Sequence, residues 1–159
     1  MMLLLRILMR IEAAVAALAY AATTLLLLAD VVAREVFSQA LWGAQQSAIL
    51  LSILAGMIGL TLATGRQAHF RPEFADAVLP FNWVNRAGDG ISAVLFAGFA
   101  YYAAEFVLES REFSDRVPII NVMLWPLQIV VPYAMASSAI KHAIFAMNPT
   151  AKRQLRGAH

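Results

Sequence analysis

The sequence contains no cysteine, which excludes disulfides, thiolate metal sites and cysteine nucleophiles. Charged residues are also scarce: they make up 14% of the 159 residues, against about 25% in an average soluble domain. Hydrophobic residues make up 61% of the chain. A protein of this size has too little interior to hide so much apolar surface from water. The composition therefore predicts an integral membrane protein whose surroundings are the lipid bilayer. No basic stripe that would bind a nucleic acid is visible.

The few charges divide the chain into apolar blocks. A helix needs roughly 20 mostly apolar residues to cross a hydrocarbon core about 30 Å thick. None of the blocks alternates as a strand does, and lipid admits only helices or closed barrels. The sequence therefore predicts an all-α integral membrane protein, a single domain of four transmembrane helices. Their approximate ranges are 11–33, 43–65, 87–109 and 119–143.

The start of the chain has two interpretations. Arg6 and Arg10 precede an apolar run, and Ala19-Tyr20-Ala21 resembles a signal-peptide cleavage site. Because the apolar run continues past that point, a retained first helix is favoured. Lys and Arg number nine on one side of the predicted spans and three on the other, which places both termini in the cytoplasm. The three on the outer side are Arg34, Arg111 and Arg116.

Two further segments have helical spacing with one apolar stripe. Residues 70–81 fit a short amphipathic helix lying at the cytoplasmic interface, with Pro72 in its first turn and Pro80 as its stop. The alternative is a structured loop packed against the helix ends. Residues 1–11 show a similar pattern, and the tail 148–159 is basic, with affinity for anionic headgroups.

The contents of the helices favour packing over transport. No ionisable residue lies in the middle of a predicted span, whereas a stand-alone proton-coupled transporter needs one. Pro126 and Pro132 are expected to bend the fourth helix. Two small-residue stripes in the second helix allow close helix approach, within the chain or with another subunit, although an alanine-rich helix also produces such stripes by chance. The stripes are Ala48, Ser52 and Gly56, and Ala55, Gly59 and Ala63.

The histidines offer an alternative function. His69 and His142 end separate predicted helices and could ligate a haem in a membrane anchor of an electron-transfer complex. Membrane cytochromes usually embed such ligands within the helices, whereas these two lie at the margins. No catalytic arrangement of side chains is legible, so we predict neither an enzyme nor a cofactor or metal site. A stand-alone small transporter is the other alternative.

Three segments resemble a known family: Arg34-Glu35-Val36-Phe37, Leu41-Trp42 and the run from Thr64 to Glu73. Their order and spacing are similar to those of the small membrane subunit (DctQ type) of tripartite ATP-independent periplasmic (TRAP) transporters. The matching positions are Arg34, Phe37, Trp42, Arg66, His69, Glu73 and, in the fourth helix, Pro132. The sequence departs from the family at Gly43-Ala44-Gln45-Gln46, where adjacent acidic residues are usual, at Phe70, where an aliphatic residue is usual, and at Pro72.

The resemblance implies a small permease subunit in the bacterial cytoplasmic membrane. In transporters of that family, a periplasmic binding protein captures an organic acid, and a large multi-span subunit imports it with a sodium gradient. The small subunit scaffolds the large one and holds no substrate site itself. Residues expected to contact these partners are Arg34, Phe37, Trp42, Gln45, Ser52, Gly56, Gly59, His69, Glu73 and Pro132.

Overall fold

The computed structural model describes residues 2–66 and 82–148 of the chain. Within these ranges the chain is helical, without a strand beyond one isolated antiparallel bridge between Arg116 and Met123. The helices are α1 (Met2–Phe37), α2 (Ala44–Arg66), α4 (Asn82–Glu112), α5 (Trp125–Gln128) and α6 (Val130–Met147). Four stretches are long and apolar enough to cross a membrane: Leu5–Phe37, Ala44–Gly65, Arg86–Glu112 and Trp125–Met147. The predicted fold class is confirmed.

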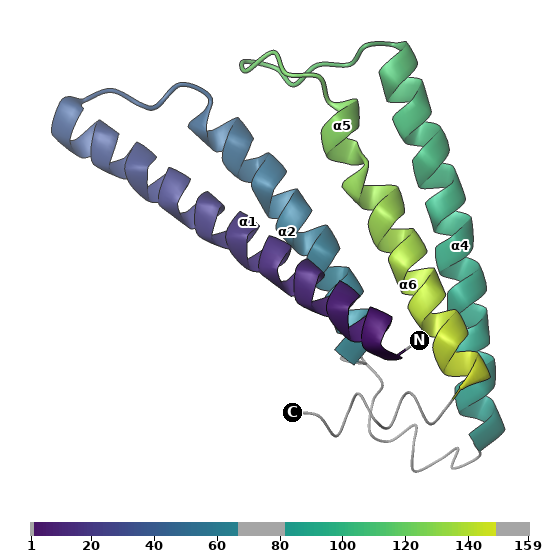
Figure 1. Ribbon diagram of the computed structural model, residues 1–159. Helices are drawn as coiled ribbons and strands as arrows, with labels where there is room; N and C mark the ends of the chain where they lie inside the picture. The colour runs from purple at the N-terminus through teal and green to yellow at the C-terminus, as the bar shows by residue number, and fades with distance from the viewer. Residues whose placement is uncertain (1, 67–81, 149–159) are drawn as a thin grey trace.

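The helices form two antiparallel hairpins that lie side by side (Figure 1). The first hairpin pairs α1 with α2, the second pairs α4 with α5 and α6, and α2 packs against α6 where the hairpins meet. The spatial order is therefore α1, α2, α6, α4. We call the end at which α1 begins and α6 ends the terminal end. The opposite end, where residues 38–43 and 113–124 connect the helices, is the loop end.

Helix α1 is longer than the predicted first span. Its 36 residues extend about 54 Å at about 1.5 Å per residue, more than the roughly 30 Å of a hydrocarbon core. The separate amphipathic helix predicted for residues 1–11 is not observed, because residues 2–11 continue directly into the span. The helix ends where Ser38 takes a left-handed conformation (φ 53°), which cannot continue a right-handed helix.

The fourth span begins at Trp125, later than the predicted range 119–143, and it is interrupted at Ile129. Residues 119–124 are not helical, and Ile119 and Asn121 have left-handed φ angles of 72° and 53°. The interruption follows from Pro132, which has no N–H to donate to the carbonyl of Gln128 and whose ring crowds that carbonyl. The backbone resumes with a hydrogen bond of 3.1 Å from the Tyr133 N–H to the Ile129 oxygen.

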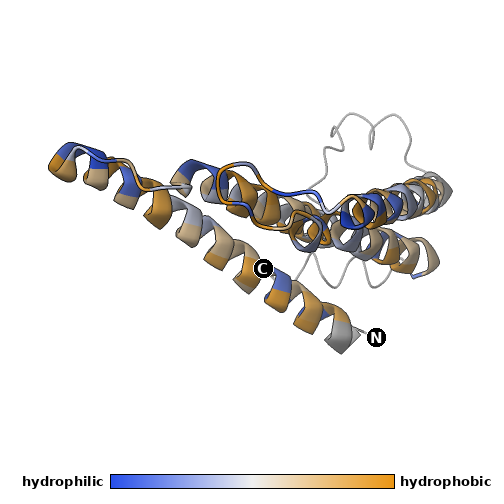
Figure 2. Cartoon of the chain, turned by 90° about the horizontal axis from the view of Figure 1, so that it is seen from above, coloured by the Kyte–Doolittle hydropathy of each residue, from blue (hydrophilic) through white to orange (hydrophobic). Residues whose placement is uncertain are grey.

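The hydrophobic surface of the helices faces outward. Large side chains such as Leu18, Leu25, Val94 and Phe99 are exposed along α1 and α4, and Figure 2 shows hydrophobic colours along the helices. The apolar interior is small: Leu5 and Phe145 form a buried cluster flanked by Met9 and Ile144 at the terminal end. Such an inside-out distribution is expected where lipid, not water, is the solvent.

Three expectations fall on residues outside the described ranges. These are the interfacial segment 70–81, the partner candidates His69 and Glu73, and the basic tail 148–159 apart from Asn148, which follows α6.

Candidate functional site

The end of α1 and its connection to α2 carry the residues of the first two resembling segments. The Asp30 carboxylate accepts hydrogen bonds from the Arg34 guanidinium and, at 2.8 Å, from the Leu41 N–H. Asp30 is buried on α1. Its hydrogen bond with Leu41 therefore holds the connection between α1 and α2 against the end of α1. The aromatic rings nearby are not part of this anchor: Phe37 is 72% exposed and Trp42 is 76% exposed. The last residue of α1 and the loop after it therefore present two aromatic rings at the surface of the loop end.

The two hairpins touch at the loop end through Gly43 and Ile120. The second connection folds back on itself, with hydrogen bonds of 2.9 Å from the Val117 N–H to the Val122 oxygen and from the Leu124 N–H to the Asp115 oxygen. Figure 1 shows this narrow loop reaching from α4 and α5 toward the start of α2. A Cβ atom on Gly43 would lie 2.3 Å from Ile120 Cγ2, and Gly43 has a left-handed φ of 71°. Glycine is required there on both counts.

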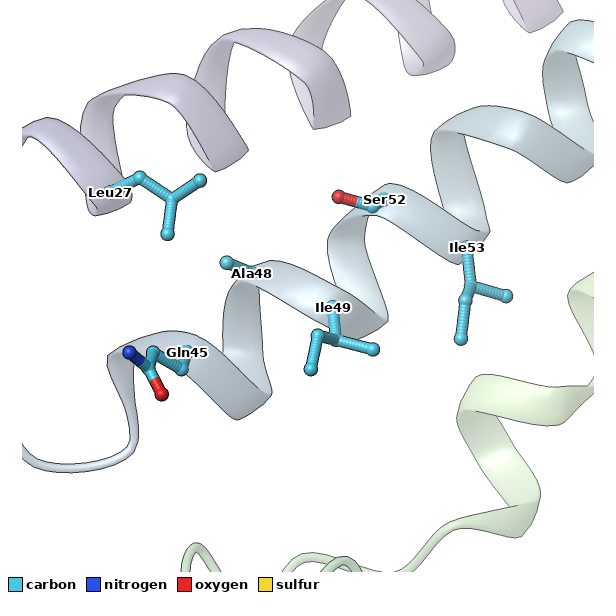
Figure 3. Close-up of a pocket in the computed structure, with 6 residues that line it drawn as sticks. All are labelled: Leu27, Gln45, Ala48, Ile49, Ser52 and Ile53. Atoms are coloured by element: carbon cyan, nitrogen blue, oxygen red, sulfur yellow. The ribbon is translucent and has the colours of Figure 1, made fainter.

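One face of α2 is open. Gln45 and Ser52 are exposed. Within the part of the chain that the structure describes, no atom beyond the local helix backbone lies within 4 Å of a Cβ built on Gly56 or Gly59. Of the first small-residue stripe, Ala48 is buried, whereas Ser52 and Gly56 are at the surface. A shallow hollow of about 530 Å³ adjoins this face; it is lined by Leu27, Gln45, Ala48, Ile49, Ser52 and Ile53 (Figure 3). Of these six lining residues, Gln45 and Ser52 have polar side chains.

The structure also brings together a buried charge cluster that the sequence analysis missed. Lys141 Nζ donates hydrogen bonds to Glu12 Oε2 at 2.6 Å and to the Thr61 carbonyl oxygen at 2.8 Å. Glu12 Oε1 accepts from Ser137 Oγ at 2.8 Å and from the Tyr133 hydroxyl at 3.2 Å. Glu12 and Lys141 are 1% and 0% exposed. Both residues lie near span ends, as the sequence analysis predicts for charged residues, but they are buried and paired with each other.

A signal for this cluster exists in the sequence. Tyr133, Ser137 and Lys141 recur every four residues, which places them on one face of a helix. A polar stripe on an otherwise apolar helix requires a partner, because an unpaired polar group in lipid is costly. The position of that partner, Glu12, could not be read from spacing, since it lies in the first helix and 129 residues away along the chain.

His142 has a local environment of its own. Its Nδ1 atom lies 3.2 Å from Asp89 Oδ1, and its ring stacks on Phe96 with 5.6 Å between ring centroids. Both contacts join α6 to α4. Within residues 2–66 and 82–148, no three His, Cys, Asp or Glu side chains gather as a metal site would require. Because His69 is outside those ranges, the haem alternative is not tested by the structure.

Comparison with known proteins decides the family. A family model described as the DctQ component of tripartite ATP-independent periplasmic transporters matches residues 23–150. The chain belongs to the DctQ family. It is therefore the small permease subunit of a TRAP transporter, a multi-pass membrane protein. None of the curated proteins compared with the chain matches it.

The DctQ match includes most of the features described above. It contains the anchored loop with Arg34 and Trp42, the open face of α2, and Lys141 with its polar stripe. Glu12 precedes the matched residues. Gln45, which stands where the family resemblance leads us to expect an acidic residue, lies at the edge of the hollow on α2.

Proposed function

We propose that this chain is a scaffold for the large subunit of a sodium-driven, binding-protein-dependent TRAP transporter that imports organic acids. Membership of the DctQ family is the observation that carries the proposal. In this proposal the chain lies in the bacterial cytoplasmic membrane with its terminal end inward. The distribution of Lys and Arg, nine against three, supports this orientation.

The interior of the chain supports a scaffolding role. The buried charges Glu12 and Lys141 neutralise each other and have further hydrogen-bond partners, so neither is left to bind a substrate or a sodium ion. The hollow beside α2 is open and mostly apolar. An organic acid needs a cation or several convergent hydrogen bonds, whereas the residues lining this hollow include no cation and supply two hydrogen-bonding side chains, Gln45 and Ser52. We therefore place the substrate and ion sites in the large subunit.

We assign the open face of α2 to the large subunit. Glycine and serine on a membrane helix permit close backbone approach by a second helix, and packing of this kind drives helix association in lipid. Ser52, Gly56 and Gly59 have this character. Among the described residues, Ser52 and Gly56 are exposed, and the space beside Gly56 and the half-buried Gly59 is open. The side of α6 near Pro132, where the helix is interrupted, is a second candidate contact.

Glycine substitutions test this assignment. Gly56→Leu and Gly59→Leu add a side chain where the chain itself has room, so the subunit folds but a partner helix is pushed away. We expect loss of copurification with the large subunit and at least a tenfold loss of uptake in proteoliposomes. Gly98→Leu is the matched control, because Gly98 on α4 is equally open. Loss of the complex with Gly98→Leu alone would move the interface to α4.

The loop end is proposed to face the periplasmic binding protein. The exposed rings of Phe37 and Trp42, together with Arg34, offer both apolar and cationic contacts there. His69 and Glu73, which follow α2, are proposed to brace the cytoplasmic side of the complex.

Removal of the whole chain tests the scaffold function. Uptake of substrate by proteoliposomes that contain the large subunit and the binding protein should be lost without this chain and restored by its addition. Full uptake without it would refute the scaffold role. Uptake by this chain alone would instead identify a stand-alone transporter.

A further inference from the structure

The buried charge cluster connects the two hairpins. Glu12 lies on α1 and Thr61 on α2, whereas Tyr133, Ser137 and Lys141 lie on α6. Every hydrogen bond in the cluster therefore crosses from one hairpin to the other. A further bond of 3.2 Å, from Thr64 Oγ1 to Ser138 Oγ, crosses one helical turn away.

Among the described residues, the hydrogen-bond partners of Glu12 lie in the second hairpin and those of Lys141 lie in the first. Separated from its partner, the first hairpin would leave the Glu12 carboxylate without these hydrogen bonds, and the second would leave the Lys141 ammonium without them. In the docked structure both Glu12 oxygens accept hydrogen bonds and Lys141 uses two of its three donors. Since ionised groups are costly in a low-dielectric medium unless paired, docking in this register is favoured over others.

We propose that Glu12 and Lys141 form an inter-hairpin lock that selects the docked register of the two hairpins and fixes their relative orientation. The lock is a positioning device, and neither residue carries a proton or an ion. The apolar cluster of Leu5 and Phe145 lies at the same end of the hairpins and supports the lock by packing. The lock itself is a property of this chain; its importance for uptake rests on the scaffold function proposed above.

A buried ion pair responds to substitution in a characteristic way. Removal of one partner leaves an uncompensated buried charge and is strongly destabilising, whereas replacement of both by apolar side chains of similar size is often neutral. Glu12→Met and Lys141→Met should each separate the hairpins, and the double variant should bring them together again. A proton- or ion-carrying carboxylate behaves differently, because its function is not recovered by a second neutral side chain.

The experiment measures the distance between the hairpins in the full chain. Spin labels on Ile7→Cys and Met147→Cys report the terminal end from exposed positions on α1 and α6, and the absence of native cysteine makes the labelling specific. We expect each single variant to shift the distance distribution to longer values and broaden it. The double variant should restore the original distribution. Glu35→Gln is the matched control, an exposed glutamate on the same helix, and should change nothing.

Uptake by the assembled transporter separates the possible outcomes. Restoration of both distance and uptake in the double variant supports the lock. Unchanged distances in the single variants, or a double variant as displaced as they are, would overturn it. A double variant that restores the distance but not the uptake would also overturn it. In that case Glu12 or Lys141 would have a role in transport beyond positioning the hairpins. A third outcome separates the two proposals: the single variants alter the distance and the double variant restores it, but the large subunit takes up substrate without this chain. That outcome would support the lock and refute the scaffold function.

Discussion

The contact between Gly43 and Ile120 makes a quantitative prediction about the loop end. Gly43→Ala introduces two separate costs. An alanine held at the left-handed φ of 71° costs about 1–2 kcal/mol. The new Cβ would lie 2.3 Å from Ile120 Cγ2, far inside the roughly 3.5–4.0 Å at which carbon atoms attract. Relief of that overlap costs about 1–3 kcal/mol more, so the sum is about 2–5 kcal/mol.

A double-mutant cycle separates the two costs. Ile120→Ala removes Cγ2 and leaves Ile120 Cβ, which lies at an ordinary contact distance of 3.8 Å from the added atom. In that background Gly43→Ala should cost only the backbone part, about 1–2 kcal/mol. The free energy of unfolding of all four variants is measured by SDS titration of the purified chain in mixed micelles. Equal costs of Gly43→Ala in both backgrounds would refute the contact, and a cost below about 0.5 kcal/mol would refute the strained backbone as well.

Two further predictions concern the same end of the molecule. Asp30→Asn keeps one acceptor oxygen, but its amide N–H₂ group must then face either Arg34 or the Leu41 N–H, which are both donors. The free energy of unfolding should therefore fall by about 1–3 kcal/mol in the same SDS titration. The control Glu35→Gln should leave it unchanged. Pro132→Ala supplies the N–H that the Gln128 carbonyl lacks, so α5 and α6 should become one continuous helix. Amide hydrogen exchange from Ile129 to Tyr133 should then slow. Unchanged exchange in these residues would show that the interruption has another cause.

The sequence predicted the four helices because each is a long apolar run, and lipid leaves such a run no other fold. The predicted second span, 43–65, is close to the observed α2. The helix ends were harder to predict. A charge such as Arg6 or Glu12 suggests the edge of the membrane, yet it does not end a helix, and α1 continues past both. Conversely, residues 119–124 are mostly apolar but are held outside the helix by left-handed backbone at Ile119 and Asn121.

In the candidate site, too, some features could be predicted from the sequence and others could not. Trp42 is exposed and the space beside Gly56 is open, and the role of both residues as partner contacts stays a prediction. The pairing of Glu12 with Lys141 and the contact of Gly43 with Ile120 depend on how two hairpins dock. Docking is determined by shape and charge across the whole interface, and no local pattern in one sequence encodes it. Only the polar stripe on α6 indicated that a partner had to exist.

The two inter-hairpin contacts together explain how a chain with so small an apolar interior can hold one shape. The charge cluster joins the hairpins at the terminal end, and Gly43 with Ile120 joins them at the loop end. A pair of hairpins fixed at a single end can pivot about that contact, whereas a pair fixed at both ends cannot. These two contacts do not use the outward faces of α1, α2 and α4. Those faces can therefore contact lipid or another subunit while the hairpins stay fixed. The scaffold role proposed above would need both properties at once: a fixed shape and an uncommitted surface.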